Sequence, residues 1–114
     1  YLRAQRFIQN GEFEKALAGL TRCISAEPKY LDAYIARGFV YSRMGNLDLA
    51  VKEYDKVLSI APLNPVALSN KGFCFYKQER YEEALNLLNK ACELDPERSD
   101  FLSNRAEVQL KLGN

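Results

Sequence analysis

The stretches LSNKGFCFY (Leu68–Tyr76) and LSNRAEVQL (Leu102–Leu110) decide the fold. Both begin with Leu-Ser-Asn and a basic residue, and they lie 34 residues apart. Three of the four prolines, Pro28, Pro62 and Pro96, have the same spacing. Self-similarity at a fixed period of about 20 to 50 residues is typical of stacked repeats, in which each unit buries its apolar face on the next. A period of 34 residues therefore organises this chain.

Four further sets of residues recur at this period. They are the small residues Ala4, Gly38, Gly72 and Ala106, the aromatic residues Phe7, Tyr41 and Phe75 (with Gln109 in the fourth place), the alanines Ala16, Ala50 and Ala84, and the bulky residues Leu20, Tyr54 and Leu88. In residues 31–44, Tyr34, Gly38 and Tyr41 fall in one narrow stripe at about 100° per residue. Residues 47–60 likewise carry apolar side chains at three- and four-residue steps, so each period predicts two helices.

Residues at the expected helix ends support this reading. Gly45 is predicted to close the first helix in a left-handed conformation, and Glu79 takes the equivalent place one period later, so that turn must close without glycine. Asn64, followed by Pro65, is predicted to cap the next helix, and Ser99 the last one. About seven helices and no strand result.

Composition bounds the function. The 114 residues are 47% hydrophobic, which suits one folded domain, and 16 basic residues against 15 acidic ones leave a net charge of only +1. So small a net charge disfavours nucleic acid as the main partner. No apolar run approaches the ~20 residues that a membrane helix needs, so membrane insertion is not expected.

The cysteine and histidine content argues against catalysis. Cys23, Cys74 and Cys92 are odd in number and show no Cys-x-x-Cys spacing, which favours buried thiols in a reducing compartment, and we expect a cytoplasmic protein. Histidine is absent, which removes the commonest general base and metal ligand. We therefore expect no enzyme activity, no cofactor and no metal.

The columns resemble the tetratricopeptide repeat family over the whole chain. The second period matches its signature at Tyr34, Gly38, Tyr41, Ala50, Tyr54 and Pro62, and the third at Leu68, Gly72, Phe75, Ala84, Leu88 and Pro96. The resemblance implies an all-α, right-handed superhelix of antiparallel helix pairs. We expect a partial repeat over residues 1–30, full repeats over 31–64 and 65–98, and at 99–114 the first helix of a further repeat or a capping helix.

The family's first helices line a concave groove that holds partner peptides, so the resemblance implies binding of a protein or peptide. The stripe beside the packing face supplies the expected contacts, with Ser42, Ser69, Ser103, Glu107, Leu110 and Lys111 on or at the edge of the same stripe. The predicted peptide-binding residues are Ile35, Phe39, Arg43, Asn70, Phe73, Tyr76, Lys77 and Asn104. Phe39 and Phe73 either bind a ligand or pack between repeats. Asn70 and Asn104 either hold a peptide backbone or are solvated.

A basic column, Arg3, Arg37, Lys71 and Arg105, flanks the other side of the first helices. It is either an anion-binding stripe or, as we favour, a row of side chains that cover apolar surface and pair locally, for instance Arg37 with Glu53. The family's clamp for a terminal carboxylate is not reproduced, because its places hold Ile35, Phe39, Asn70, Asp100 and Asn104. Recognition of a free acidic C-terminus is therefore not expected.

Three functions remain open. The first is an interaction module, part of a longer scaffold or adaptor, that binds a mostly apolar or mixed peptide. The second is a substrate-presenting arm of an enzyme whose catalytic domain lies elsewhere, and the third is a self-associating spacer. The last helix is predicted to bury a stripe at Leu102 and to leave Leu110 and Leu112 without cover, which favours self-association or a capping role.

Overall fold

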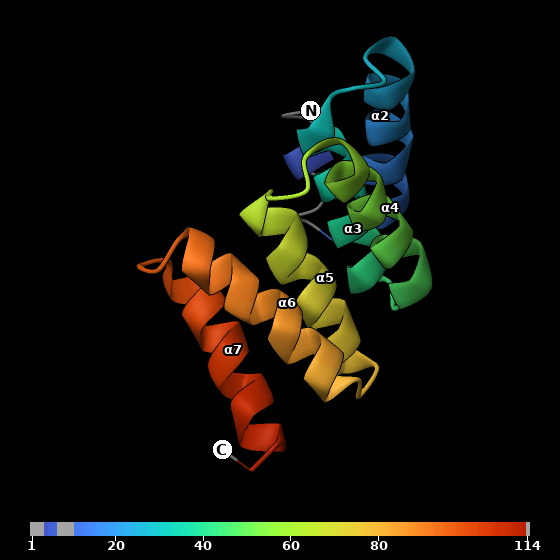
Figure 1. Cartoon of the computed structure of the whole chain (residues 1–114). Coiled ribbons are helices and arrows are strands. Elements are labelled where there is room, and N and C mark those ends of the chain that lie inside the picture. The colour runs from blue at the N-terminus through green and yellow to red at the C-terminus, as the bar shows by residue number, and fades with distance from the viewer. Residues whose placement is uncertain (1–3, 7–10, 114) are drawn as a thin grey trace. The chain divides into compact units, whose positions relative to one another are not determined.

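The computed structural model describes residues 4–6 and 11–113, and every regular element in these residues is helical. Residues 4–6 are helical, and six further helices follow (Figure 1): α2 (Phe13–Ala26), α3 (Leu31–Arg43), α4 (Leu47–Ile60), α5 (Pro65–Lys77), α6 (Tyr81–Leu94) and α7 (Ser99–Lys111). The predicted all-α fold is confirmed. The helices end where the turn residues predicted, because glycine, proline and asparagine occupy the connections.

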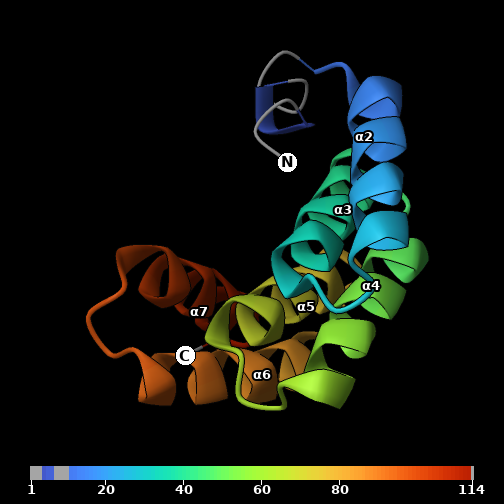
Figure 2. The same cartoon turned by 90° about the horizontal axis from the view of Figure 1, so that it is seen from above.

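The chain forms two compact units, residues 1–57 and 58–114. In the first, helices α2 and α3 pack side by side (Figure 2). Its core joins small and branched side chains from both helices and from residue 4: Ala4, Ala16, Leu20, Ala33, Ala36 and Val40. Half-buried side chains such as Phe13 and Tyr30 close this core at its edges.

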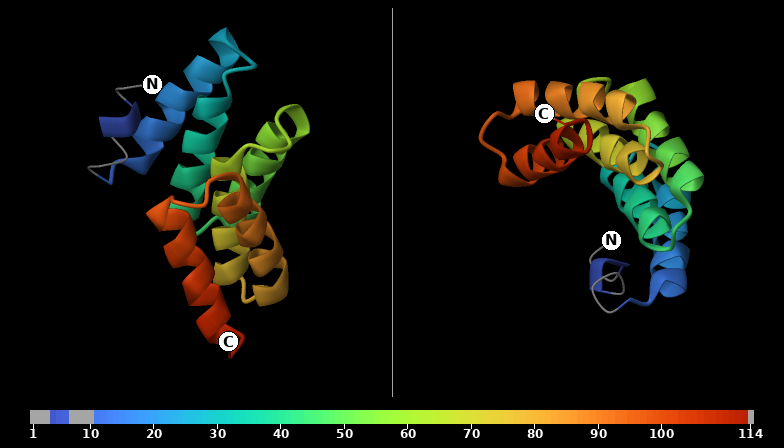
Figure 3. Two further views of the ribbon diagram at one scale, coloured as in Figure 1. Left: turned by 60° about the vertical axis from the view of Figure 1, so that its left-hand side comes forward. Right: turned by 90° about the horizontal axis from the view of Figure 1, so that it is seen from below.

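The second unit contains α5, α6 and α7, with α6 packed against both of the others (Figure 3). Its core consists of Leu68 on α5, Ala91 and Cys92 on α6, and Phe101 on α7. Phe101 is only 1% exposed and Val108 on the same helix is fully buried, so these two residues anchor α7. The prediction that α7 packs through Leu102 is wrong, since 37% of Leu102 is exposed. Leu110 is exposed as predicted, whereas Leu112 is half-buried.

The small-residue column allows close helix contacts within each unit. A Cβ built on Gly38 would lie 2.6 Å from Cε1 of Tyr54, and one on Gly72 would lie 3.0 Å from Cγ of Leu88. Both glycines are buried in the middle of helices, where glycine costs roughly 1 kcal/mol of helix stability. The close approach of α4 to α3, and of α6 to α5, explains why glycine is present.

The turns that follow α3 and α5 close in the same way. Gly45 has φ of 86°, and its N–H and that of Asn46 donate to the carbonyls of Ser42 and Tyr41. Glu79 has φ of 62° and completes the same pattern after α5. Both are Schellman motifs, in which a left-handed residue satisfies the last carbonyls of a helix. The predicted turn without glycine is confirmed.

The predicted N-caps have different outcomes. The side chain of Asn64 accepts a hydrogen bond of 3.1 Å from the N–H of Ala67, with Pro65 at the first helical position, as predicted. Ser99 is not a cap, because α7 already begins at this residue. Asp100 acts there instead: its Oδ1 accepts from the N–H of Phe101 and from Nε of Arg98.

No helix in the described part of the chain has the length and apolar character that a membrane span requires.

Candidate functional site

An exposed aromatic and cationic cluster lies in the first unit, at the end of α3 and the start of α2. The guanidinium carbon of Arg43 lies 5.8 Å from the centre of the Phe39 ring and 5.7 Å from that of Phe13. Such distances are within the range of cation–π attraction. Arg43 has no carboxylate partner among the residues that the structure describes, and 38% of Phe39 is exposed. We call Phe13, Phe39 and Arg43, with the neighbouring Met44, the Arg43 cluster.

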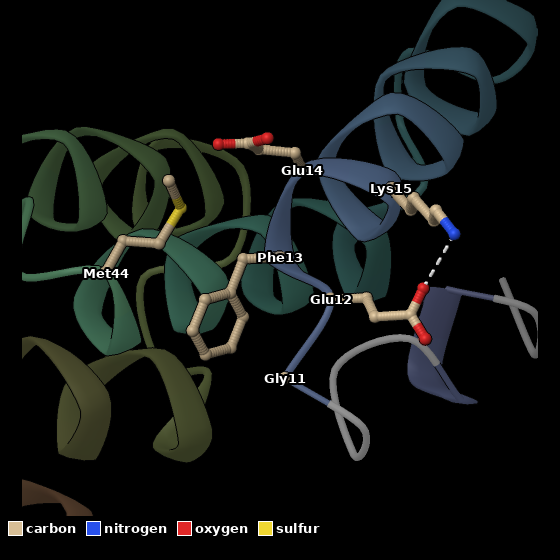
Figure 4. A pocket seen from close by; sticks show the side chains of 6 residues that line it. All are labelled: Gly11, Glu12, Phe13, Glu14, Lys15 and Met44. Carbon is tan, nitrogen blue, oxygen red and sulfur yellow. Dashed lines mark ion pairs between the residues drawn. The ribbon is translucent and has the colours of Figure 1, made fainter.

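Met44 extends this cluster toward an open hollow that Gly11, Glu12, Phe13, Glu14 and Lys15 also line. Figure 4 shows the Phe13 ring between Met44 on one side and the ion pair of Glu12 with Lys15 on the other. That ion pair spans 2.9 Å and is largely exposed. The hollow therefore combines an apolar wall with a charged rim.

The second unit carries a comparable cluster on α5 and α6. Nζ of Lys77 lies 5.3 Å from the centre of the Phe73 ring, the Phe73 and Tyr76 rings are 5.9 Å apart, and Tyr76 and Tyr81 are also 5.9 Å apart. Lys77 is exposed and the three rings are half-buried. We call these four residues the Lys77 cluster. It offers aromatic faces beside a cation, as the Arg43 cluster does.

The expected asparagine pair is only partly available to a ligand. Nδ2 of Asn104 donates a hydrogen bond of 3.5 Å to Oγ of Ser69, so Asn104 takes part in the packing of α7 against α5. Ser69 is 1% exposed, and its predicted place in the binding stripe is therefore wrong. The cause is the neighbouring helix, which covers this part of α5. Asn70 is half-buried.

The other predicted positions follow the exposed side of the first helices. Ile35 and Ser42 are half-buried, whereas Ser103, Glu107, Leu110 and Lys111 are exposed. Sequence reasoning missed Phe13, Met44 and Tyr81. Phe13 and Tyr81 were recognisable, because both begin a second helix and occupy one column of the 34-residue period, with Leu47 between them.

The basic column acts locally where the structure describes it. Nη2 of Arg37 forms an ion pair of 2.9 Å with Oε1 of Glu53, as predicted, and Nη1 donates to Oγ1 of Thr21 at 3.4 Å. Nζ of Lys71 lies 5.6 Å from the centre of the Phe75 ring, and Arg105 is half-buried. Arg3 lies outside the described residues. The Arg37 contacts link three helices, which is a structural role.

The titratable groups show no arrangement for acid–base or metal chemistry in the described residues. Burial raises the pKa of the Cys74 thiol to about 11, which makes it a poor nucleophile at neutral pH. The hydrogen bond from Arg80 lowers the pKa of Glu83, an exposed surface pair. No group of three or more potential metal ligands occurs in this part of the protein. What the described surface offers is aromatic and cationic contact.

Known proteins resemble this chain in sequence. The sequence profile described as "Tetratricopeptide repeat" matches residues 30–97. The type IV pilus assembly protein PilF of Pseudomonas aeruginosa is 34% identical over 108 residues, covering 93% of this chain and 43% of PilF. The human mitochondrial import receptor subunit TOM70 is 26% identical over 117 residues, covering 98% of this chain and 19% of TOM70. The chain thus spans less than half the length of these relatives.

Solved structures agree with the sequence comparison. The structure of P. aeruginosa PilF superposes with a TM-score of 0.88 at 32% identity, covering 98% of this chain and 51% of PilF. The first TPR of Spaghetti (RPAP3), solved bound to the HSP90 peptide SRMEEVD, gives a TM-score of 0.89 at 17% identity and covers 98% of this chain and 89% of that domain. Fold and sequence profile together show that this chain, an all-α helical-repeat solenoid, belongs to the tetratricopeptide repeat family.

Proposed function

We propose that this chain is a protein-interaction module that binds a peptide segment of a partner protein through the Arg43 cluster and the Lys77 cluster. The observation that carries the proposal is a repeated pair. Phe39 and Arg43, and Phe73 and Lys77, stand four residues apart on α3 and α5, and each cation lies over its ring. Both units therefore present the same combination of an aromatic face and a positive charge.

The chemistry of the clusters indicates the kind of peptide. Aromatic faces bury apolar side chains, and aromatic residues tend to dominate the binding energy of protein interfaces. Arg43 and Lys77 favour a carboxylate beside such an apolar residue, because an exposed cation near a ring has free hydrogen-bond donors. Asn70 can both donate to and accept from a peptide backbone. We therefore infer a mixed peptide with apolar and acidic residues.

Two observations from other proteins are compatible with this proposal. The first TPR of Spaghetti shares the fold and was solved with a peptide bound. PilF, which is similar in both sequence and structure, is described as an assembly protein. The residues that bind the partner of this chain are argued from its own clusters.

The test is affinity capture with cross-linking to identify a bound segment, followed by titration of that peptide into variants. Phe39→Ala and Phe73→Ala should each weaken binding, and the double variant should weaken it at least about tenfold, because truncation of a central aromatic costs ~2 kcal/mol or more. Helicity and melting temperature should stay nearly unchanged, since both rings are partly exposed.

Matched controls separate binding from general loss of apolar surface. Leu49 and Leu94 are 42% and 41% exposed and lie outside both clusters, so the Leu49→Ala/Leu94→Ala double variant should bind normally. If the Phe39→Ala/Phe73→Ala variant binds as tightly as the parent but unfolds readily, the rings are core residues and the proposal is wrong.

A further inference from the structure

Helix α7 has one apolar side that no helix in the described part of the chain covers. Leu102, Ala106 and Leu110 lie four residues apart on this side, and we call them the α7 outer face. Leu110 is 76% exposed, Leu102 is 37% exposed and Ala106 is also exposed. The opposite side packs through the buried Phe101 and Val108, next to α5 and α6 (Figure 3). The α7 outer face is thus separate from the contacts that hold α7 in place.

The residues 34 positions earlier show what covers such a face. Leu68, the equivalent of Leu102, is 5% exposed and packs with Ala91 and Cys92 of α6. Gly72, the equivalent of Ala106, lies against Leu88 and the carbonyl of Ala84, also on α6. In the first unit Gly38 meets Tyr54 of α4 in the same way. The cover is in both cases an amphipathic helix with alanine followed, four residues later, by a bulky side chain.

Ala106 restricts which helix can fit. A β-carbon at Gly72 would lie 3.0 Å from Cγ of Leu88, and one at Gly38 would lie 2.6 Å from Cε1 of Tyr54. A helix packed as closely as α6 or α4 would therefore collide with the β-carbon that Ala106 carries. Residue 4 is also alanine and is buried, and the residue of α2 that faces it is Gly19. A β-carbon on Gly19 would lie 3.8 Å from Cβ of Ala4, so this pair leaves room.

We propose that the α7 outer face binds an amphipathic helix of a partner protein that carries the pattern Ala-x-x-Gly-Leu, as Ala16, Gly19 and Leu20 do in α2. The glycine admits the β-carbon of Ala106, and the leucine fills the space between Leu102 and Leu110. This interaction does not depend on the peptide proposed for the two clusters, because it uses a different side of the last helix.

Gln109 adds a polar contact to this docking surface. Its equivalent Phe75 lies under the guanidinium of Arg80, 3.9 Å from the ring centre, and Arg80 precedes the first residue of α6. Position 109 therefore faces the start of the docked helix. An amide there can donate to a carboxylate in the first turn, as Glu14 would supply in an α2-like helix. Acidic residues are also favoured in that turn by the helix dipole.

The test is a titration of the 114-residue chain with two labelled peptides, followed by fluorescence anisotropy. One is residues 12–29 with Cys23→Ser, and the other is residues 80–97 with Cys92→Ser. The α2 peptide should bind saturably, and the α6 peptide should bind at least about fivefold more weakly because Ala106 overpacks against it. Ala106→Gly in the chain should reduce or reverse this preference. Equal binding of the two peptides, or no binding of the α2 peptide, overturns the proposal.

Matched variants show where the peptide binds. Leu110→Asp should abolish binding, whereas Leu63→Asp, at a residue that is 57% exposed outside the α7 outer face, should not. An α2 peptide with Leu20→Asp should not bind. If binding survives Leu110→Asp, the peptide has replaced the chain's own α2, and the assignment of the face is wrong. If the chain dimerises on its own and Leu110→Asp makes it monomeric, a second copy is the occupant and the partner helix is rejected.

Discussion

Gly38 lies directly against the ring of Tyr54, so close that an added β-carbon would be 2.6 Å from Cε1 and 2.9 Å from Cζ. Tyr54 is 1% exposed, and its ring has little space into which it can move. The contact joins α3 to α4. It explains why a residue that is unfavourable in a helix occupies the centre of α3.

Gly38→Ala should therefore destabilise the fold. Alanine improves helix propensity by about 1 kcal/mol, but overpacking against a buried ring costs about 1–3 kcal/mol, so we expect a net loss of up to about 2 kcal/mol. Urea unfolding followed by circular dichroism measures it. Gly19→Ala is the matched control, because its β-carbon would meet only Cβ of Ala4 at 3.8 Å, and it should be stabilising or neutral. Stabilisation by both substitutions would show that the Tyr54 ring has room.

Arg37→Met should destabilise the protein more than Arg37→Met/Glu53→Met. The two side chains are 19% and 13% exposed, and removal of the cation leaves Glu53 as a largely buried, unpaired charge. We expect the single variant to lose about 1–3 kcal/mol, below the full cost for a completely buried pair because some solvent reaches both groups. The double variant should recover most of the loss. Additive losses in this double-mutant cycle would show that the pair is not coupled.

Stability should fall at high pH through Cys74. Its pKa is about 11 in the folded protein against an ordinary value of 9.0, so the folded state holds this proton more tightly than the unfolded chain. The unfolded chain is therefore favoured progressively as pH rises from 9 to 11, and the effect levels off above 11. Urea midpoints measured across this range should decline less in Cys74→Val.

Valine is a suitable replacement for Cys74, since Val40 and Val108 fill the same column of the period and both are fully buried. The half-buried Cys23 should react with a thiol reagent at pH 8 well before Cys74 does. Parallel pH profiles in the parent and Cys74→Val would contradict the assignment to this thiol.

The peptide SRMEEVD should not be recognised through its terminal carboxylate. Position 100 is an aspartate whose Oδ1 accepts hydrogen bonds from Arg98 and from the N–H of Phe101, and Asn104 donates to Ser69. An anion at the first position repels a carboxylate, and the amide at the second is already used in packing. Isothermal titration with the free acid and the C-terminal amide of this peptide should give the same weak or absent signal. Markedly tighter binding of the free acid would be the contrary result.

Repetition in the sequence was sufficient for the fold, because the same physical requirement recurs every 34 residues. Gly38 and Gly72 mark the close helix contacts, and Asn64 with Pro65 marks a helix start. Even the turn at Glu79 was predictable, since the helices on either side leave no other way to satisfy the carbonyls of α5. Signals of this kind are local and do not depend on which helix packs where.

Residues that touch across helices were harder to predict. Ser69 is as polar as Ser42, but α7 covers it, and Asn104 turns toward it rather than toward solvent. Ser99 matches the composition of a cap, yet the chain enters α7 at Arg98, and Asp100 accepts the hydrogen bonds there. Phe13 and Tyr81 stand at the starts of second helices, and only the antiparallel packing of α2 with α3 brings Phe13 next to Arg43.

By itself, then, the sequence determined the period, the helices and their ends, because helix propensity, capping and apolar spacing act between residues near in the chain. Tertiary structure decided which polar side chains are covered and which aromatic rings meet a cation. The physical reason is that burial of a side chain depends on the neighbouring helix, and a shift of one residue along the α7 helix, from Leu102 to Phe101, exchanges the exposed side for the core.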